Sequence, residues 1–279
     1  MVSIRRIAFF RRDDNVRAEA WEERLRTWLK KNHRNVQVST KNPHAVVVLG
    51  GDGTMLEAVR RYRARKTIFL GLNLGEVGFL ASVREPQKFK KAIDALLMGT
   101  FTIAERMMIS AEVIRDEKIV FQTSALNEVV VQNPLGLANL EVTIEGHPIQ
   151  YIRGSGVIVA TATGSTAYNL SAHGPIVMPQ IKCLIVTELL DHNIPTPSIV
   201  IKHNKNIAIT VSNFRTRKLL TLTESKKAFD VLLTADSAEF FALERDDRVM
   251  VRRSPQLTRW AEIESNYFFK SLHERFAFR

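Results

Sequence analysis

The sequence predicts an α/β domain with a parallel sheet, followed by an all-β domain of the sandwich type. In the first hundred residues, apolar runs of strand type alternate with amphipathic helical segments, which is typical of a parallel sheet covered on both faces. After about Phe101, short β-rich runs are separated by turn residues at a spacing typical of a sandwich or barrel. We therefore expect domains over residues 1–100 and 101–263, with a helix at residues 264–279 that packs back on the first domain.

Each element of the first domain follows from its pattern of apolar residues. Strands are predicted at residues 4–10, 36–38, 45–49 and 67–72, and helices at residues 15–31, 56–62 and 85–98. Trp21, Leu25 and Trp28 form one apolar stripe on the first helix. Phe89, Ile93 and Leu97 share one face of the third. Both helices are therefore expected to be amphipathic.

The second domain is predicted to consist of strands until its last residues. The predicted strands lie at residues 107–115, 119–131, 140–144, 156–160, 183–187, 199–201, 207–211, 218–222, 230–234 and 248–251. Residues 264–276 return to a helical pattern. We find no internal repeat and no low-complexity linker.

Composition and cysteine content limit the class of protein. Hydrophobic residues make up 45% and charged residues 25% of the chain, as in soluble globular proteins. No apolar run is long enough to span a bilayer, and the first ten residues have too short an apolar core for a signal peptide. Cys183 is the only cysteine, which excludes an intramolecular disulfide and a cysteine-rich metal site. A cytoplasmic location is the simplest expectation.

The net charge of +11 favours anionic ligands. The basic residues are scattered along the chain, in groups such as Arg5-Arg6, Arg11-Arg12 and Arg252-Arg253. Basic residues on helix faces and strand edges also keep a protein soluble. We therefore expect attraction of polyphosphate ligands and no binding of nucleic acid or membrane.

The turn Gly50-Gly-Asp-Gly-Thr54 is the most informative feature of the chain. It follows a buried-strand pattern and precedes a helical segment, and ligands bind at the carboxyl ends of parallel strands. Glycines let the backbone approach a ligand, and successive N–H groups at a helix start bind phosphate. Asp52 places one carboxylate in this positive cradle, where it holds a metal ion or takes a proton. An enzyme that acts on nucleotide phosphates is indicated.

Two simpler interpretations compete with this one. A glycine-rich turn can be a plain connection, and Asp52 can be a helix cap. The turn also lacks the Gly-Lys-Ser/Thr of a P-loop and the third glycine of the dinucleotide fingerprint. If it binds phosphate, the turn is therefore of a kind distinct from both the P-loop and the dinucleotide-binding turn.

Two further segments carry candidate ligand-binding residues. The loop Asn73-Leu-Gly-Glu-Val-Gly-Phe-Leu80 either binds a ligand with Phe79 as an exposed aromatic lid, or is an ordinary loop with Phe79 in the core. Asn127 and Glu128 can accept hydrogen bonds from two neighbouring sugar hydroxyls, although solvated polar residues on a strand are the default.

The segment Thr161-Ala-Thr-Gly-Ser-Thr-Ala-Tyr168-Asn-Leu-Ser171 is rich in small hydroxyl side chains. Its hydroxyls can bond a ligand and Tyr168 can stack on a base, whereas a capped helix start is the simpler interpretation. Asp236 follows an apolar run and is expected to anchor a turn. The chain has no Gly-x-Ser-x-Gly and no His-Glu-x-x-His motif, and its seven histidines show no metal-binding spacing.

In content and in order, these segments resemble the NAD kinase family. The resemblance runs through Gly50-Gly-Asp-Gly-Thr54, Asn73-Leu-Gly, Gly78-Phe-Leu80, Glu105-Arg106, Ala125-Leu-Asn-Glu128, Thr163-Gly-Ser-Thr-Ala-Tyr168, Gly174-Pro175, Asp236-Ser237 and Tyr267-Phe268. It spans nearly the whole chain. Lipid kinases and phosphofructokinases carry turns similar to the first motif, so the later motifs give the resemblance its specificity.

The resemblance implies a Rossmann-like α/β domain, a β-sandwich domain, a site between them, and a homodimer or homotetramer. It implies ATP, or polyphosphate, as the phosphate donor, with Mg²⁺ or another divalent cation. The phosphate would pass to a ribose hydroxyl of an adenine-containing acceptor, with NAD as the first expectation and its 2′-hydroxyl as the target.

The resemblance also assigns residues. Asp52 would accept the proton of the attacking hydroxyl, and the phosphates would lie against Gly50, Gly51, Gly53 and Thr54. Mg²⁺ would be held by the phosphates, with Asp52 as a candidate ligand. Asn127 and Glu128 would hold the acceptor's ribose or its phosphate-linked portion. The other acceptor-binding residues would be Asn73, Phe79, Arg153, Ser155, Thr163, Thr166, Ala167, Tyr168 and Ser171.

The chain departs from the family pattern at positions that normally meet the acceptor. Ser155 stands where the family usually has Asp, and Ala238 stands where Gln is common. The segment Glu188-Leu-Leu-Asp-His192 with Pro195-Thr-Pro197 replaces a loop that ends in Pro-His and Arg-Pro. Loss of a polar partner for a buried group costs about 1–3 kcal/mol. A nucleoside kinase acting on adenosine or deoxyadenosine is therefore the alternative, and a non-catalytic nucleotide-binding protein is a lesser one.

Overall fold

The structure is a computed structural model. It describes residues 4–62, 66–75, 78–192, 196–223, 225–264 and 266–276. The chain divides into two compact units: unit 1 comprises Met1–Arg106 and Gln256–Arg279, and unit 2 comprises Met107–Pro255. Both passages between units fall inside strands, β5 (Thr102–Arg115) and β18 (Arg248–Glu262), rather than at residues 100 and 263.

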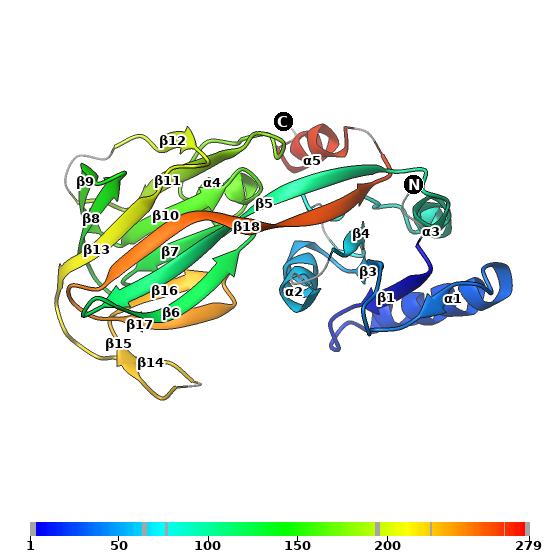
Figure 1. Ribbon diagram of the computed structural model, residues 1–279, viewed down its shortest axis with the longest axis horizontal. Coiled ribbons are helices and arrows are strands. Elements are labelled where there is room, and N and C mark those ends of the chain that lie inside the picture. Colours follow the sequence, from blue (N-terminus) through cyan, green and yellow to red (C-terminus); the bar gives the residue numbers. More distant parts are fainter. Residues whose placement is uncertain are drawn as a thin grey trace. The chain divides into compact units, whose positions relative to one another are not determined.

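A parallel sheet forms the centre of unit 1 (Figure 1). Its strands, in spatial order, are β2 (Gln37–Val38), β1 (Arg6–Phe10), β3 (Ala45–Leu49), β4 (Ile68–Leu72) and the end of β18. All neighbouring pairs in this series are parallel. Every residue of β3 and β4 is buried, which is expected for parallel strands covered on both faces. The predicted parallel sheet is confirmed.

The α-helices of unit 1 bury one face each. They are α1 (Val16–Asn32), α2 (Asp52–Tyr62), α3 (Phe89–Met98) and α5 (Tyr267–Phe276). The 3₁₀ turn η1 (Pro86–Lys88) has no buried residue. Leu25 of α1 and Phe89 and Ile93 of α3 belong to one core cluster with β1, β3 and β4, and Trp21 and Trp28 pack against it. The two predicted amphipathic faces are therefore confirmed.

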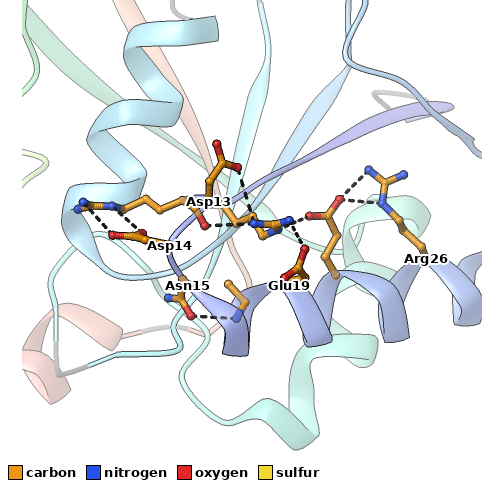
Figure 2. Close-up of polar contacts among 9 residues, drawn as sticks. Asp13, Asp14, Asn15, Glu19 and Arg26 are labelled. Carbon is orange, nitrogen blue, oxygen red and sulfur yellow. Dashed lines mark hydrogen bonds and ion pairs between the residues drawn. The ribbon is translucent and has the colours of Figure 1, made fainter.

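Arg11 and Arg12, which follow β1, are held in ion pairs with nearby carboxylates. Figure 2 shows this network at the start of α1. Arg11 Nη2 lies 2.8 Å from Glu19 Oε1 and its Nε lies 3.1 Å from Glu22 Oε2, while Arg12 Nε lies 3.5 Å from Asp14 Oδ1. Exposed ion pairs contribute only about 0–1 kcal/mol each. Their main consequence is that part of the basic charge near this strand end is neutralised locally.

Unit 2 consists of two sheets. One has the spatial order β12 (Ile199–Lys202), β11 (Cys183–Leu189), β10 (Gly156–Thr161), β7 (Glu128–Gln132), β16 (Val231–Ala235) and β17 (Glu239–Leu243). The other has the order β6 (Lys118–Ala125), β5, β18, β13 (Ile207–Phe214), β8 (Ala138–Ile144) and β9 (His147–Gly154). A small hairpin, β14 (Leu220–Thr221) with β15 (Ala228–Phe229), stands apart from both.

The two sheets of unit 2 share one core. Val129 and Leu184 of the first sheet lie in one cluster with Leu140, Ile209 and Val249 of the second. Two short helical segments, η2 (Gly164–Thr166) and α4 (Tyr168–Ser171), follow β10 in the chain. The two sheets form the predicted β-sandwich.

Several elements differ from those predicted. Residues 119–131, predicted as one strand, form β6 and β7 in different sheets, because the chain crosses between the sheets at Leu126-Asn127. Helix α2 begins at Asp52 rather than at residue 56, α3 is preceded by η1, and α5 begins at Tyr267. Of residues 218–222 only β14 forms a strand. We did not predict β9, β15, β17 or most of β18; in β9 and β18 exposed residues interrupt the apolar pattern.

Candidate active site

The glycine turn at the carboxyl end of β3 has open space beside two of its glycines. The N–H of Gly50 donates to Leu72 O at the end of β4, at 3.1 Å. A Cβ on Gly50 would lie 2.4 Å from Thr54 Oγ1, whereas Cβ atoms on Gly51 or Gly53 would meet no atom within 4 Å. This open side borders the first N–H groups of α2, an arrangement that suits a phosphate group.

Asp52, the first residue of α2, has both carboxylate oxygens bonded to backbone N–H groups of another loop. Phe79 N–H donates to Oδ2 at 2.8 Å and Leu80 N–H donates to Oδ1 at 2.9 Å. A Cβ on Gly78 would lie 2.3 Å from Oδ1, so this close approach requires glycine. The half-buried carboxylate is thus held in one orientation. A cap would instead bond the N–H groups of its own helix, so the helix-cap interpretation is not supported.

The loop after β4 does not present an aromatic lid. Phe79 is 4% exposed, and its ring packs against Phe268 of α5 with centroids 5.8 Å apart. The interpretation of Phe79 as an exposed lid is therefore wrong, and the core interpretation is confirmed. Asn73 is also buried, and its Oδ1 accepts a hydrogen bond from Gly75 N–H at 2.9 Å. Glu76 and Val77 of this loop lie outside the described residues.

A buried charged cluster lies in the same unit. Arg106 is 2% exposed, and its Nη2 donates to Glu262 Oε1 at 2.8 Å and to Tyr267 Oη at 2.6 Å. Its Nη1 is buried without a hydrogen-bond partner in the described part of the chain. Burial raises the pKa of Tyr267, the Arg106 charge opposes the rise, and the charges of Glu262 and Asp52 add to it. We predicted no role for Arg106 or Tyr267, although both lie in segments of the family resemblance.

Unit 2 carries a second group of polar side chains, centred on Asn127 and Glu128 at the start of β7. Their exposed fractions are 6% and 4%, so the expectation of solvated strand residues is wrong. Asn127 Oδ1 and Glu128 Oε2 are buried and have no hydrogen-bond partner among the residues that the structure describes. Two unpartnered acceptor oxygens on consecutive residues suit a ligand that presents neighbouring hydroxyl groups.

Asp236 anchors the backbone of this pair. Its carboxylate accepts hydrogen bonds from the N–H groups of Leu126 (2.7 Å), Asn127 (2.8 Å) and Glu128 (3.2 Å). Asp236 and Ser237 both adopt the left-handed conformation, with φ of 48° and 52°. The N–H of Asp236 donates back to Glu128 O at 3.1 Å. The predicted turn anchor is confirmed, and it supports the residues with the unpartnered oxygens.

Glu128 holds its proton to a higher pH than an ordinary carboxyl group does. Burial raises its pKa to about 8, the Asp236 charge adds to the rise, and a hydrogen bond from the backbone N–H of Tyr168 opposes it. A protonated carboxyl group can both donate and accept a hydrogen bond. When protonated, Glu128 can therefore either donate a hydrogen bond to a ligand hydroxyl or accept one from it.

The segment after β10 packs beside the Asn127-Glu128 pair. Thr161 Oγ1 donates to Leu126 O at 2.6 Å and accepts a hydrogen bond from Gly164 N–H at 3.1 Å. A Cβ on Gly164 would lie 2.2 Å from Asn127 O. Glycine therefore permits residues 163–168 to approach the pair closely.

The predicted binding groups of this segment differ in accessibility. Tyr168 is 39% exposed, and its ring is accessible for stacking. Ser171 is exposed at the end of α4, and Ala167 is half-buried. Thr163 and Thr166 are buried, and Thr166 Oγ1 donates to Thr163 O at 3.3 Å. The tyrosine ring and the serine hydroxyl are thus the more accessible groups.

Arg153 and Ser155 lie where β9 passes into β10. Arg153 is exposed, and its N–H donates to Asp191 Oδ1 at 3.0 Å. Ser155 is half-buried, and its N–H donates to Leu189 O at 2.8 Å. Over the described ranges, no hydrogen bond joins either residue to Asn127 or Glu128. Pro195, part of the segment that departs from the family pattern, lies outside the described residues.

Replacement of Asp236 by alanine should loosen the turn at residues 126–128. Three N–H groups lose their acceptor, and we expect the free energy of unfolding to fall by about 2–4 kcal/mol. Urea unfolding would measure the loss. Asp236→Asn keeps one side-chain oxygen and a residue type that tolerates a positive φ, so it should be milder. Equal stability of Asp236→Ala and the parent would contradict the anchoring role.

The described ranges lack two kinds of feature. No helix there has both the length and the apolar character needed to cross a bilayer. No group of three or more His, Cys, Asp or Glu side chains there is arranged to hold a metal ion.

Family comparisons match most of the chain. The family model of the ATP-NAD kinase N-terminal domain matches residues 11–101, and that of the ATP-NAD kinase C-terminal domain matches residues 126–263. The NAD kinase of Natranaerobius thermophilus is 33% identical over 232 residues, which cover 82% of this chain and 76% of that protein. The NAD kinase of Geobacter metallireducens is 31% identical, and the alignment covers 98% of each protein.

Two solved structures share the fold. Yeast NADH kinase complexed with NADH superposes with a TM-score of 0.86 at 20% identity, covering 100% of this chain and 89% of that one. An NAD kinase from Archaeoglobus fulgidus in complex with ATP gives a TM-score of 0.76 at 22% identity, covering 97% and 98%.

The fold and the matched domains define an ATP-dependent kinase composed of an α/β domain and a β-sandwich domain. The chain belongs to the NAD kinase family. Both the resemblance seen in the sequence and the expected fold are confirmed. The chain is an enzyme, and the expectation of a non-catalytic binding protein is set aside.

Proposed function

We propose that this enzyme transfers the γ-phosphoryl group of ATP to the 2′-hydroxyl of NAD, producing NADP. The observation that carries the proposal is the buried pair Asn127 and Glu128, whose Oδ1 and Oε2 lack hydrogen-bond partners within the described residues. Leaving such groups unpaired costs about 1–3 kcal/mol each. A ribose supplies two neighbouring hydroxyl groups that would satisfy both oxygens. The relatives named NAD kinase support NAD as the source of that ribose.

Asp52 is the proposed proton acceptor. A general base must be oriented before the reaction and must be reachable by the attacking hydroxyl. The two backbone hydrogen bonds at 2.8 and 2.9 Å orient this carboxylate, and its half-buried position leaves it reachable. Each oxygen retains a lone pair for the incoming proton.

The proposed phosphate site is the turn around Asp52. Phosphoryl transfer depends mainly on positioning and on neutralisation of charge. Gly51 and Gly53 have open space where a side chain would stand, and Gly50 and Thr54 fix the turn by close packing. We infer that the backbone N–H groups here bind the phosphates of ATP.

Mg²⁺ is the proposed divalent cation. Mg²⁺ commonly keeps several waters and is held by one or two carboxylates together with substrate phosphates. The described residues fit that arrangement, because they offer the single carboxylate of Asp52 at the turn and no cluster of three ligands. When bound, the cation neutralises charge on the phosphates.

The remaining acceptor-site residues keep their predicted roles as proposals. Tyr168 would stack on the adenine, with Thr166, Ala167 and Ser171 beside it. Thr163, Arg153 and Ser155 would complete the acceptor site, and Asn73 and Phe79, which are buried, would shape it through the backbone of their loop. The homo-oligomeric state and the cytoplasmic location also stay predictions.

A direct assay tests the proposed acceptor. The purified enzyme would be incubated with ATP and Mg²⁺, with NAD and adenosine in separate reactions, and the products identified by mass spectrometry. NADP is the expected product, and removal of the cation with a chelator should abolish its formation. Adenosine monophosphate without NADP would overturn the proposal in favour of the nucleoside kinase alternative, which the comparisons do not support.

A further inference from the structure

The peptide group between Gly78 and Phe79 is held from both sides. On one side, its N–H donates to Asp52 Oδ2 at 2.8 Å. On the other, its carbonyl oxygen lies 3.0 Å from Ser271 Oγ and 3.3 Å from Arg84 Nη2. Because a peptide group is planar and rigid, contacts on the carbonyl fix the direction of the N–H. The position of the Asp52 carboxylate therefore depends on residues that do not touch it.

Ser271 belongs to α5 and is fully buried. Its Oγ also lies 2.9 Å from Tyr267 O, and its single proton serves one of the two carbonyls at a time. Arg84 Nη2 donates to Ser271 Oγ as well as to Gly78 O. The serine and the arginine thus form one hydrogen-bonded unit on this carbonyl.

Charge strengthens this arrangement. A guanidinium on the carbonyl oxygen draws electron density from the amide and makes its N–H a stronger donor to a carboxylate. Arg84 Nη1 is itself held by Glu274 of α5, at 2.5 Å. The arginine side chain is largely buried, with 19% of its area exposed, so solvent weakens these contacts little.

Helix α5 is fixed at the loop by further contacts. The Phe268 ring packs on Phe79, and the Arg275 guanidinium lies 5.7 Å from the centre of the Phe79 ring. Tyr267 Oη accepts the hydrogen bond from Arg106 at its first turn. A loop that packs against a helix fixed at several points is held more firmly than a loop with a single contact.

We propose that Ser271 and Arg84 are positioning residues for Asp52. They hold the Gly78–Phe79 peptide in the orientation in which its N–H binds and aligns the carboxylate for proton transfer. This inference rests on the proposed role of Asp52 as the proton acceptor. Under this inference, helix α5 contributes to the phosphoryl-transfer step and not to the binding of ATP.

The test compares kcat and KM for ATP and NAD in Ser271→Ala, Arg84→Met and Arg84→Lys. We expect kcat to fall about tenfold in Ser271→Ala and Arg84→Met, which corresponds to roughly 1.4 kcal/mol. KM for ATP should stay near that of the parent, and Arg84→Lys should recover part of the rate because it keeps a cation near the carbonyl. Lys270→Gln, an exposed neighbour on α5, is the control and should keep the parent's kcat.

Folding and the proposed function are checked in the same series. Circular dichroism would establish that each variant is folded under the assay conditions, and Asp52→Asn would be assayed beside them. If Asp52→Asn is inactive while folded Ser271→Ala and Arg84→Met keep the parent's kcat, the positioning role is overturned. If Asp52→Asn itself keeps the parent's kcat, the proposed function of Asp52 fails instead.

Discussion

Replacement of Asp52 by asparagine is expected to abolish most phosphoryl transfer while leaving the fold intact. Asparagine has nearly the same shape but cannot take a proton from the attacking hydroxyl, and loss of a general base lowers kcat about 10²–10⁴-fold. The amide also turns an N–H₂ group toward Phe79 N–H or Leu80 N–H, so one of the two backbone bonds is lost. Steady-state kinetics with ATP and NAD would measure the fall in kcat.

Glu57→Gln provides a matched control on the same helix. Glu57 is a partly exposed carboxylate whose ion pair with Arg12 spans 3.7 Å, and its removal should leave kcat unchanged. A folded Asp52→Asn enzyme with near-normal turnover would contradict the role of Asp52 as proton acceptor.

Replacement of Glu128 by glutamine is expected to stabilise the protein, and to do so more at high pH. The pKa of Glu128 in the fold is about 8, above the ordinary value of 4.5. The folded state therefore binds more protons than the unfolded chain between these two values, and the free energy of unfolding falls as the pH rises through that window. Glutamine has no charge to bury, so the variant should escape this loss.

The expected difference is measurable by urea unfolding. At about pH 5 the parent and Glu128→Gln should be similar, and at about pH 9 the variant should be more stable by about 3 kcal/mol. Glu23→Gln, an exposed position on α1, is the control and should not alter the pH dependence. If the free energy of unfolding depended on pH in the same way in the parent and in Glu128→Gln, this carboxyl group would ionise as easily in the fold as in water, which would contradict the prediction.

Local signals in the sequence predicted most of the fold. The run Ala45–Leu49 is apolar at every position because both faces of the strand are covered, and the Gly50 that follows is needed for close packing against Thr54. Strands with interrupted patterns were missed for the opposite reason. In β9 the apolar Ile149 and Tyr151 are exposed and the polar Gln150 is buried, so residue type does not mark the buried face of this strand.

Site residues that lie in short sequence motifs were predicted. Contacts between residues that are distant in sequence were missed. Asn127 and Glu128 were found from residue type, but their burial depends on Gly164, which permits the close approach of a distant segment. Arg84 and Ser271 are 187 residues apart, and no local pattern joins them. The burial of Phe79 likewise involves its contact with Phe268 of α5, which is distant in sequence.

The discontinuous composition of unit 1 imposes an order on how the enzyme matures during synthesis. Unit 2 is one uninterrupted stretch, Met107–Pro255, and its residues are translated before the end of β18 and α5. Until then the β4 edge lacks its neighbours Arg259 and Trp260, and the loop at Asp52 lacks Ser271. The glycine turn is thus translated early, but the loop that binds Asp52 gains its contact with Ser271 only once α5 has been made.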